Sequence, residues 1–352
     1  MNFRVAKEKP VLLLTMGDPG GVGPEIILKS LRNSFPKNSI PIVIGSESVF
    51  RYASERLAIP FRPNVIRSLD DPMLQPNQIN LLDITDEAEV TYEKRIGKKL
   101  PPAGKRFAIA KVSKWNACLA HAALEKAAFG AARYQIHAVV TAPVHKGAMR
   151  LVDPHFLGHT EYLARAARVK DFAMMFVSER FCVTLATTHL PLKRVARVLS
   201  PQGIVTKIRL TNEFLKERLK IKFPRIGVAS LNPHGREFGT EEDEIVLPAV
   251  QAARRKGIRV EGPLPGDQVF HDAYEGRFDA VVAMYHDQGL APFKMIAFRD
   301  GVNVTLGLPY LRTSPDHGTA FDIAYRNRAF PSAMINSIRL ADRGVLRSTS
   351  SR

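Results

Sequence analysis

The chain has 352 residues and a formal net charge of +17, from 51 Lys and Arg against 34 Asp and Glu. This length predicts two domains, and no run of the sequence approaches the roughly 20 apolar residues of a membrane-spanning helix. Cys118 and Cys182 lie far apart in no metal-ligand spacing, which excludes a disulfide framework and favours a reducing cytoplasm. The first apolar segment covers only about six residues before a glycine turn, so we expect no secretory signal peptide.

Positive charge is concentrated in residues 92–115, which hold eight Lys or Arg and one Glu. Such a stretch can bind nucleic acid, but it carries no zinc-finger or RNA-binding signature. We therefore interpret it as a solvated insertion and keep a basic nucleic-acid-binding protein as a remote alternative. A basic surface also attracts phosphorylated substrates, so the charge is compatible with an enzyme.

Short apolar runs alternate with amphipathic stretches along most of the chain. Runs rich in Val, Ile and Leu, separated by helical patterns, are typical of an α/β fold with a largely parallel sheet. The expected helices include residues 115–130 and 200–219, the second with Ser200 as a candidate N-cap before Pro201. The expected strands are residues 10–14, 40–45, 79–84, 137–142, 181–188, 225–231, 279–285 and 302–307.

A glycine-rich turn, MGDPGGVGPE at residues 16–25, joins the first expected strand to a helix that begins near Pro24. Its spacing matches neither the dinucleotide-binding GxGxxG motif nor a Walker motif. A plain strand-to-helix turn would explain it. Glycine also permits close approach of a ligand to the backbone, and the N-terminus of the following helix favours negative charge.

Four histidines follow expected strands by a few residues: His145, His189, His234 and His286. Ligands of open α/β sheets bind outside the carboxyl ends of the strands, so these side chains can converge on one crevice. A single histidine there is more often a hydrogen-bonded structural residue. Several together favour a shared site, and three imidazoles with one open position can form a catalytic divalent-metal site.

Other polar residues suit an anionic ligand. His159 precedes Thr160, which could cap a helix and leave its N-terminal amides to hold an anion. Arg312 follows the last expected strand and can pair with a carboxylate or phosphate in a bidentate fork. Lys294 supplies a second cation. Each of these could instead be an ordinary cap or surface charge.

Taken together, the motifs resemble one family. The ordered set MGDPGGVGPE, TAPVHKG, GHTEYLA, TTHLPL, LNPHG, GPLPGD, AMYHDQGLAPFK and GVNVTLGLPYLRTSPDHGTA is similar to the 4-hydroxythreonine-4-phosphate dehydrogenase family over about residues 10–340. A wider resemblance, through GDPGGVGPE and HGTAFDIAY, is to the isocitrate and isopropylmalate dehydrogenase fold. The expected fold is therefore α/β, with two α/β domains and a cleft between them.

The resemblance implies roles for residues at the matching positions, and it removes His145 from the ligand set. The implied metal ligands are His189, His234 and His286. The implied substrate contacts are His159, Thr160, Lys294, Asn303 and Arg312. The implied cofactor contacts are Gly318, Thr319, Ala320 and Asp322, and the base candidates are Asp267, Asp287 and Lys146.

The resemblance also implies an activity and an assembly. The activity is oxidation of 4-hydroxy-L-threonine 4-phosphate by NAD or NADP with one divalent ion (Zn, Mg or Co). Its product, 2-amino-3-oxo-4-phosphooxybutanoate, decarboxylates to 3-amino-2-oxopropyl phosphate in pyridoxal phosphate biosynthesis. The assembly is a cytoplasmic homodimer, whose shared active site is completed by a metal-binding histidine of the neighbouring chain.

The expected domains are 1–150 plus 288–352, which would hold the nucleotide, and 151–287, which would hold the metal ligands and dimerise. One motif departs from the family pattern, because NPHGREFGTEE is shorter than usual and places Arg236 in the loop after His234. A related phosphorylated sugar acid, 4-phospho-erythronate or 4-phospho-threonate, is therefore the alternative substrate. No nucleic-acid or membrane partner is expected.

Overall fold

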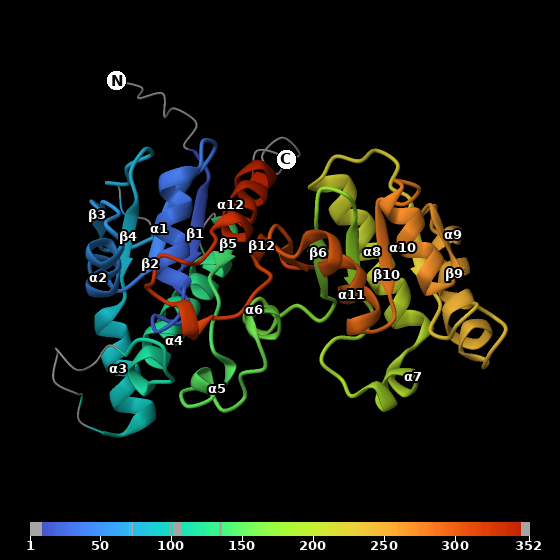
Figure 1. The fold of residues 1–352 in the computed structure, drawn as a ribbon, viewed down its shortest axis with the longest axis horizontal. Helices are drawn as coiled ribbons and strands as arrows, with labels where there is room; N and C mark the ends of the chain where they lie inside the picture. The colour runs from blue at the N-terminus through green and yellow to red at the C-terminus, as the bar shows by residue number, and fades with distance from the viewer. Residues whose placement is uncertain are drawn as a thin grey trace. The chain divides into compact units, whose positions relative to one another are not determined.

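The computed structural model describes residues 9–69, 71, 73–98, 100, 108–133 and 136–345. The chain divides into two compact units, one of residues up to Arg168 together with those from Pro309 onward, the other Val169–Leu308 (Figure 1). The expected boundaries near residues 150 and 288 differ from these. The first unit extends beyond residue 150 because α6 (His159–Ala166) packs on α4 (Lys114–Arg133), and the second extends beyond 288 because β11 (Val302–Leu306) pairs with β6 (Ala173–Val177).

The first unit contains a parallel sheet. Its strand order is β3 (Asn64–Ile66), β4 (Asn80–Asp83), β2 (Ile40–Gly45), β1 (Val11–Thr15), β5 (Ile136–Thr141) and β12 (Leu311–Pro315). Every pairing among these strands is parallel. All the carboxyl ends therefore lie along one edge of the sheet.

Helices cover this sheet. On it pack α4, which contacts β1, β2 and β5, and α12 (Ser332–Val345), which contacts β5 and β12. The remaining helices are α1 (Gly23–Asn33), α2 (Glu47–Leu57), α3 (Thr85–Ile96), the short α5 (Lys146–Met149) and the 3-10 turn η4 (Phe321–Ile323). Residues Leu12, Leu13 and Leu14 of β1 are fully buried, as a strand covered on both faces requires.

The second unit has a mixed sheet. Its order is β11, β6, β7 (Cys182–Leu185), β10 (Ala280–Ala283), β8 (Ile226–Ala229) and β9 (Val260–Leu264). Strand β6 is antiparallel to both neighbours, whereas β7, β10, β8 and β9 run parallel. The carboxyl ends of the three central parallel strands, β7, β10 and β8, are therefore adjacent.

Helices α8 (Pro201–Glu217) and α11 (His286–Ala297) pack on the central strands of this sheet. An aromatic core that includes Phe176, Phe181 and Phe293 fills the α11 side. The remaining elements are the short turns η2 (Leu192–Arg194) and α7 (Val195–Val198), the π-helical η3 (Glu242–Val246), α9 (Leu247–Arg255) and α10 (Gly266–Tyr274).

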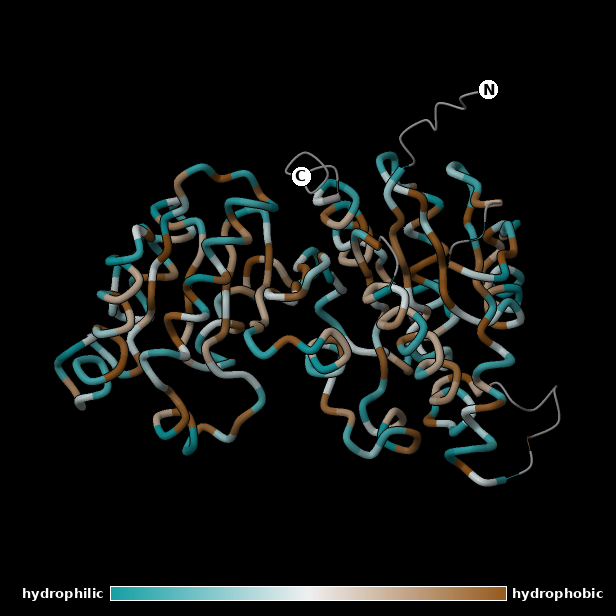
Figure 2. The backbone as a smooth tube through the Cα atoms, turned by 180° about the vertical axis from the view of Figure 1, so that it is seen from behind, coloured by the Kyte–Doolittle hydropathy of each residue, from teal (hydrophilic) through white to brown (hydrophobic). Residues whose placement is uncertain are grey.

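The predicted α/β class is confirmed, and all eight expected strands and both expected helices are present. Hydrophobic residues follow the strands in both units (Figure 2). Ser200 caps α8 as predicted, its Oγ accepting from the amide of Gly203 at 3.2 Å. In the described ranges, no helix has the length and apolarity to cross a membrane. The basic stretch 92–115 lies partly outside the described residues.

Candidate functional site

The second unit brings two of the three predicted metal ligands together. His189 follows β7 and His286 begins α11 just after β10, and these strands are parallel neighbours. The two ring centres are 5.8 Å apart. Because an imidazole nitrogen binds zinc at about 2.0–2.1 Å, the centres of two rings that share one ion lie roughly 5–6 Å apart. The pair therefore fits a shared divalent ion.

The orientation of His286 is fixed by a carboxylate. Its Nδ1 lies 2.6 Å from Oδ1 of Asp287, which leaves Nε2 as the nitrogen that can bind a ligand. Metal-bound histidines are commonly held in this way, because a carboxylate on the second nitrogen sets the tautomer. Asp287, predicted as a base candidate, is thus a partner of His286 in this chain.

A hydrogen-bond network ties the three strand ends together. Gln288 Nε2 donates to the carbonyl of Ser230 at 2.6 Å, and Gln288 Oε1 accepts from the amide of Met284 at 2.7 Å. Thr187 Oγ1 donates to the carbonyl of Met284 at 2.8 Å. These bonds connect the loops after β8, β10 and β7, so they hold the histidine-bearing loops in register.

His234 lies in the separate loop after β8. Buried Glu242 organises the start of this loop, with Oε1 accepting from the amides of Leu231 and Asn232 at 2.7 and 2.8 Å. The backbone of His234 is left-handed, with φ of 54°. Arg236, the residue that departs from the family motif, pairs with Asp243 at 2.5 Å.

The predicted three-histidine group is not assembled by one chain. Within the described residues, no three His, Cys, Asp or Glu side chains are placed to hold one metal ion. His189 and His286 approach each other, and His234 does not complete a group with them. The three-ligand site therefore stays a prediction.

The first unit holds a buried cationic cluster where the carboxyl end of β5 lies beside β12. Arg312 on β12 is 2% exposed, and its Nη2 donates to Oγ1 of Thr141 on β5 at 2.6 Å. Burial lowers the pKa of this guanidinium to about 10, against a smaller raising effect of Tyr310. The guanidinium stays charged at neutral pH. Burying a charge costs free energy, which an anionic ligand bound to Arg312 would offset.

His159 belongs to the same cluster. Burial first, and then the charges of Arg312 and Lys146, hold the pKa of His159 well below its usual range. The imidazole is therefore neutral at pH 7 and can donate one hydrogen bond. In the described part of the chain its Nε2 is buried with no hydrogen-bond partner, which is the state expected of a group that awaits a ligand.

The prediction that Thr160 caps a helix is wrong. Helix α6 begins at His159 with Gly158 as its N-cap, so Thr160 lies inside the first turn. Thr160 is 4% exposed. It therefore stays with His159 and Arg312 in the first unit, but it does not act as the cap.

The glycine-rich turn and the predicted cofactor segment lie side by side. The amide of Val22 donates to the carbonyl of Thr319 at 2.9 Å, and a Cβ on Gly21 would lie 2.6 Å from that oxygen. Ala320 is left-handed, with φ of 43°, while Gly318 and Asp322 are exposed. Only glycine at position 21 allows this contact, so the two motifs form one surface.

The other predicted residues are spread over both units. Lys146 begins α5 in the first unit, whereas Asp267 lies in the first turn of α10 in the second. In the second unit Lys294 lies over the ring of Phe298 at 5.6 Å. Asn303 is on β11, and among the described residues its buried Oδ1 has no hydrogen-bond partner.

Sequence reasoning missed several supporting residues. Thr141, Gln288 and Glu242 each stand inside or beside a motif that was recognised, but each bonds to a residue ten or more positions away: Arg312, Ser230 and Leu231 respectively. No local pattern marks such contacts. A polar residue at the carboxyl end of a buried strand, as Thr141 is, is the one signal that points to a site.

Comparison with known proteins decides the family. The family model described as pyridoxal phosphate biosynthetic protein PdxA matches residues 37–341. The chain belongs to this family. It is 42% identical to a 4-hydroxythreonine-4-phosphate dehydrogenase of Desulforapulum autotrophicum, over 95% of each chain. It is 40% identical to a D-threonate 4-phosphate dehydrogenase of Pectobacterium atrosepticum, over 94% of this chain and 98% of the relative.

Solved structures agree with this family assignment. The structure of a 4-hydroxythreonine-4-phosphate dehydrogenase from Klebsiella pneumoniae has a TM-score of 0.80 and 37% identity, covering 96% of this chain and 99% of that one. A terephthalate 1,2-cis-dihydrodiol dehydrogenase from Burkholderia xenovorans has a TM-score of 0.64 at 24% identity, over 95% and 98% of the two chains. The second shows a shared fold alone.

Proposed function

We propose that this PdxA-family chain oxidises 4-hydroxy-L-threonine 4-phosphate with NAD or NADP and a divalent ion. The product, 2-amino-3-oxo-4-phosphooxybutanoate, then loses CO2 to give 3-amino-2-oxopropyl phosphate, a step of pyridoxal phosphate biosynthesis. The observation that carries the proposal is the buried cluster of Arg312, His159 and Thr141, a site for an anion in a chain whose relatives are named as dehydrogenases of phosphorylated substrates.

The cationic cluster is proposed to bind the anionic groups of the substrate. Arg312 would pair with an anion through its planar fork, while neutral His159 donates one bond and Thr160 lies beside it. Lys294 and Asn303 of the second unit are proposed as further contacts. Burial strengthens each of these bonds, since the local dielectric is low.

His189 and His286 are proposed as two ligands of the divalent ion. Their 5.8 Å approach and the Asp287 contact support this assignment. When bound, such an ion acts as a Lewis acid on the substrate oxygen, and a nicotinamide accepts the hydride. Zn, Mg and Co remain candidates, since imidazole binds several divalent ions.

The third ligand and the cofactor surface complete the proposal. We assign the third ligand to His234 of a second copy, within a homodimer whose units follow the isocitrate/isopropylmalate dehydrogenase-like arrangement with a cleft. Residues Gly318, Thr319, Ala320 and Asp322 are proposed to hold the nucleotide, because they lie against the glycine-rich turn. A cytoplasmic location fits such an enzyme. Lys146 and Asp267 remain candidates for the base.

The proposal is tested by identifying the product. The purified protein is incubated with 4-hydroxy-L-threonine 4-phosphate, a divalent ion and NAD or NADP, and the mixture is examined by mass spectrometry. We expect a product that has lost two hydrogens and CO2, in a one-to-one ratio with reduced nucleotide. Unchanged substrate with both nucleotides and all three metals would refute the activity.

A second substrate is favoured by one specific observation. The relative from Pectobacterium atrosepticum, named for D-threonate 4-phosphate, is nearly as similar to this chain as the amino-substrate relative. Phospho-threonate differs at C2, where a hydroxyl replaces the ammonium. It is therefore the alternative substrate, together with 4-phospho-erythronate.

A further inference from the structure

A basic surface lies at the amino ends of β8 and β9, at the opposite end of the second sheet from His189 and His286. The segment 216–225 leads from α8 into β8 and holds five Lys or Arg. The segment 254–259 leads from α9 into β9 and holds four more, and the two segments together contain one acid, Glu217. The exposed residues that define this amino-edge surface are Lys220, Lys222, Phe223, Arg255, Lys256 and Arg259.

The sheet holds the two segments side by side. The amide of Ile226 donates to the carbonyl of Arg259 at 3.0 Å, where the parallel strands β8 and β9 begin. Arg254 Nε donates to the carbonyl of Val260 at 2.9 Å, which ties the end of α9 to β9. The guanidinium of Arg259 lies 4.5 Å from the ring centre of Phe223. The amino-edge surface is therefore one continuous area built on the ends of two strands.

Neighbouring carboxylates do not neutralise this surface. Arg225, which lies next to it in the sequence, pairs with Asp279 at 3.6 Å. None of the ion pairs found in the described ranges involves any of the five cations of the amino-edge surface. Like charges held close together repel each other, and a bound polyanion relieves that repulsion. The charge of the surface therefore favours a polyanionic partner.

Phe223 favours single-stranded nucleic acid over other polyanions. Its side chain is 54% exposed, and Lys222 Nζ lies 5.3 Å from its ring centre in addition to the Arg259 contact. Proteins that bind single strands combine cations for the phosphates with exposed aromatic rings on which the bases stack. An acidic peptide has no base to stack, and stable anchoring to a membrane takes more apolar area than one ring supplies.

We propose that the amino-edge surface binds single-stranded nucleic acid without sequence preference. Its lysines and Arg255 bind the phosphates, and a base stacks against Phe223 and Arg259. Because His189 and His286 lie at the other end of the parallel strands, the bound strand leaves the proposed metal ligands accessible. The inference is independent of the proposed function, since neither the surface nor its ligand takes part in the oxidation.

The test is fluorescence anisotropy of a labelled oligo(dT) of about 12 nucleotides, titrated with the full chain between about 50 and 200 mM KCl. We expect a Kd of roughly 10 μM near 100 mM salt. The logarithm of the affinity should fall with the logarithm of the salt concentration, with a slope of about −3 for four neutralised phosphates. A duplex of the same length should bind more weakly, because its bases are already stacked.

One pair of variants tests the aromatic contact. Phe223→Ala should weaken binding by roughly 10-fold, since stacking of one base is lost. Phe129→Ala is the matched control, because Phe129 is 51% exposed in the first unit and has Arg133 5.5 Å from its ring centre. This control should leave the affinity unchanged.

A second pair tests the location of the charge. Arg255→Glu with Lys256→Glu should weaken binding by roughly 100-fold. Lys111→Glu with Lys114→Glu changes the net charge equally at exposed positions of the basic stretch 92–115, and it should cost less than about 3-fold. Circular dichroism checks that each variant is folded.

Four results would overturn the inference. The first is no binding of the oligonucleotide by wild type at the lowest salt concentration. The second is an equal loss of affinity in a variant and its matched control, for either pair. The third is a duplex that binds as tightly as the single strand. The fourth is tighter binding of poly-L-glutamate or of phosphatidylserine vesicles, which would assign the surface to an acidic protein or to a membrane.

Discussion

At the scale of single residues, burial sets the charge of each group in the anion site. Arg312 keeps its proton, since even a pKa lowered to about 10 leaves it cationic at neutral pH. His159, in the same surroundings, loses its proton because burial and two neighbouring cations oppose a further charge. The cluster thus offers one strong cation and one neutral donor.

The neutral state of His159 predicts a pH dependence of stability. Its folded pKa lies below the unfolded value of about 6.5, so the unfolded chain binds an extra proton as pH falls below that value. The free energy of unfolding is therefore unaffected by protonation of His159 above about pH 6.5. Below that pH it falls, by up to about 1.4 kcal/mol per pH unit. His159→Asn should therefore flatten the fall of the unfolding midpoint between pH 7.5 and 5.5.

Thermal unfolding of both proteins over this range measures the difference. Buried His121, whose pKa burial also lowers, contributes the same slope to both. Parallel curves for wild type and His159→Asn would show that folding does not lower the pKa of His159.

Arg312 predicts a loss of substrate binding. Lys in its place keeps the charge but not the planar fork, and the shorter reach of its donors breaks the bond to Thr141. Arg312→Lys should lower kcat/KM by roughly 100-fold or more, mainly through KM. Arg209→Lys, at an exposed ion pair with Asp171, is the control. Equal kinetics for both variants would rule out Arg312 as a substrate contact.

The sequence predicts some site residues well and others poorly. His189 and His286 follow apolar runs, and the rule that ligands bind at the carboxyl ends of strands brings them together. Arg312 is different, because it lies inside β12, whose sequence LRTSP reads as a loop. Its burial depends on Thr141, which is distant in sequence.

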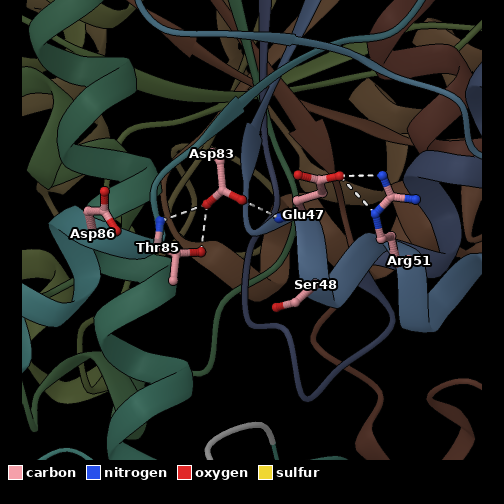
Figure 3. A pocket seen from close by; sticks show the side chains of 6 residues that line it. All are labelled: Glu47, Ser48, Arg51, Asp83, Thr85 and Asp86. Atoms are coloured by element: carbon pink, nitrogen blue, oxygen red, sulfur yellow. Dashed lines mark hydrogen bonds and ion pairs between the residues drawn. The ribbon is translucent and has the colours of Figure 1, made fainter. Parts of the chain in front are cut away.

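At the scale of elements, one carboxylate holds two helices at the carboxyl end of the first sheet. Asp83, the last residue of β4, accepts from the amide of Glu47 at the start of α2 at 2.9 Å. It also accepts from the amide and hydroxyl of Thr85 at the start of α3, at 2.8 and 2.6 Å. Figure 3 shows these bonds beside a hollow of about 470 Å³.

This double cap predicts a local stability effect. Asp83→Ala removes the acceptor for three donors and should lower the free energy of unfolding by about 2 kcal/mol. Asp86→Ala is the matched control, since Asp86 lines the same hollow but is exposed, and it should cost less than about 1 kcal/mol. Urea denaturation followed by circular dichroism measures both. An equal loss in the two variants would contradict the capping role.

The strands and helices that were predicted correctly have continuous runs of buried apolar residues. The eight expected strands are apolar, helix α4 is rich in buried apolar residues, and helix α8 carries an amphipathic pattern and the Ser200 cap. Strands β3, β6, β9 and β12 were not predicted. β3 is a three-residue edge strand, β9 contains Gly262 and Pro263, and β12 is fully buried although it holds Arg312 and Thr313. Tertiary hydrogen bonds satisfy such polar strands, so local propensity misses them.

At the scale of the whole molecule, the proposed metal site takes ligands from two subunits. One chain brings His189 and His286 together but not His234. A site shared across a dimer should therefore be restored by mixing complementary inactive variants. This property depends on assembly, so neither the periodicity nor the spacing of the sequence could show it.

The prediction concerns three inactive variants, His189→Ala, His234→Ala and His286→Ala. After unfolding and refolding together, either mixture that contains His234→Ala should recover roughly a quarter of wild-type activity, because one site in each mixed dimer is intact. The mixture of His189→Ala with His286→Ala should stay inactive, since both lie on one chain. Turnover and metal content are measured together. If no mixture recovers, the site is not shared.

The most direct test of the account is nicotinamide reduction with 4-hydroxy-L-threonine 4-phosphate, measured before chelation, after chelation and after return of a divalent ion. The account predicts substrate-dependent reduction that the chelator abolishes and the ion restores, and none of these in His189→Ala although its fold is intact. Reduction that survives complete removal of metal, or that persists in His189→Ala, would contradict it.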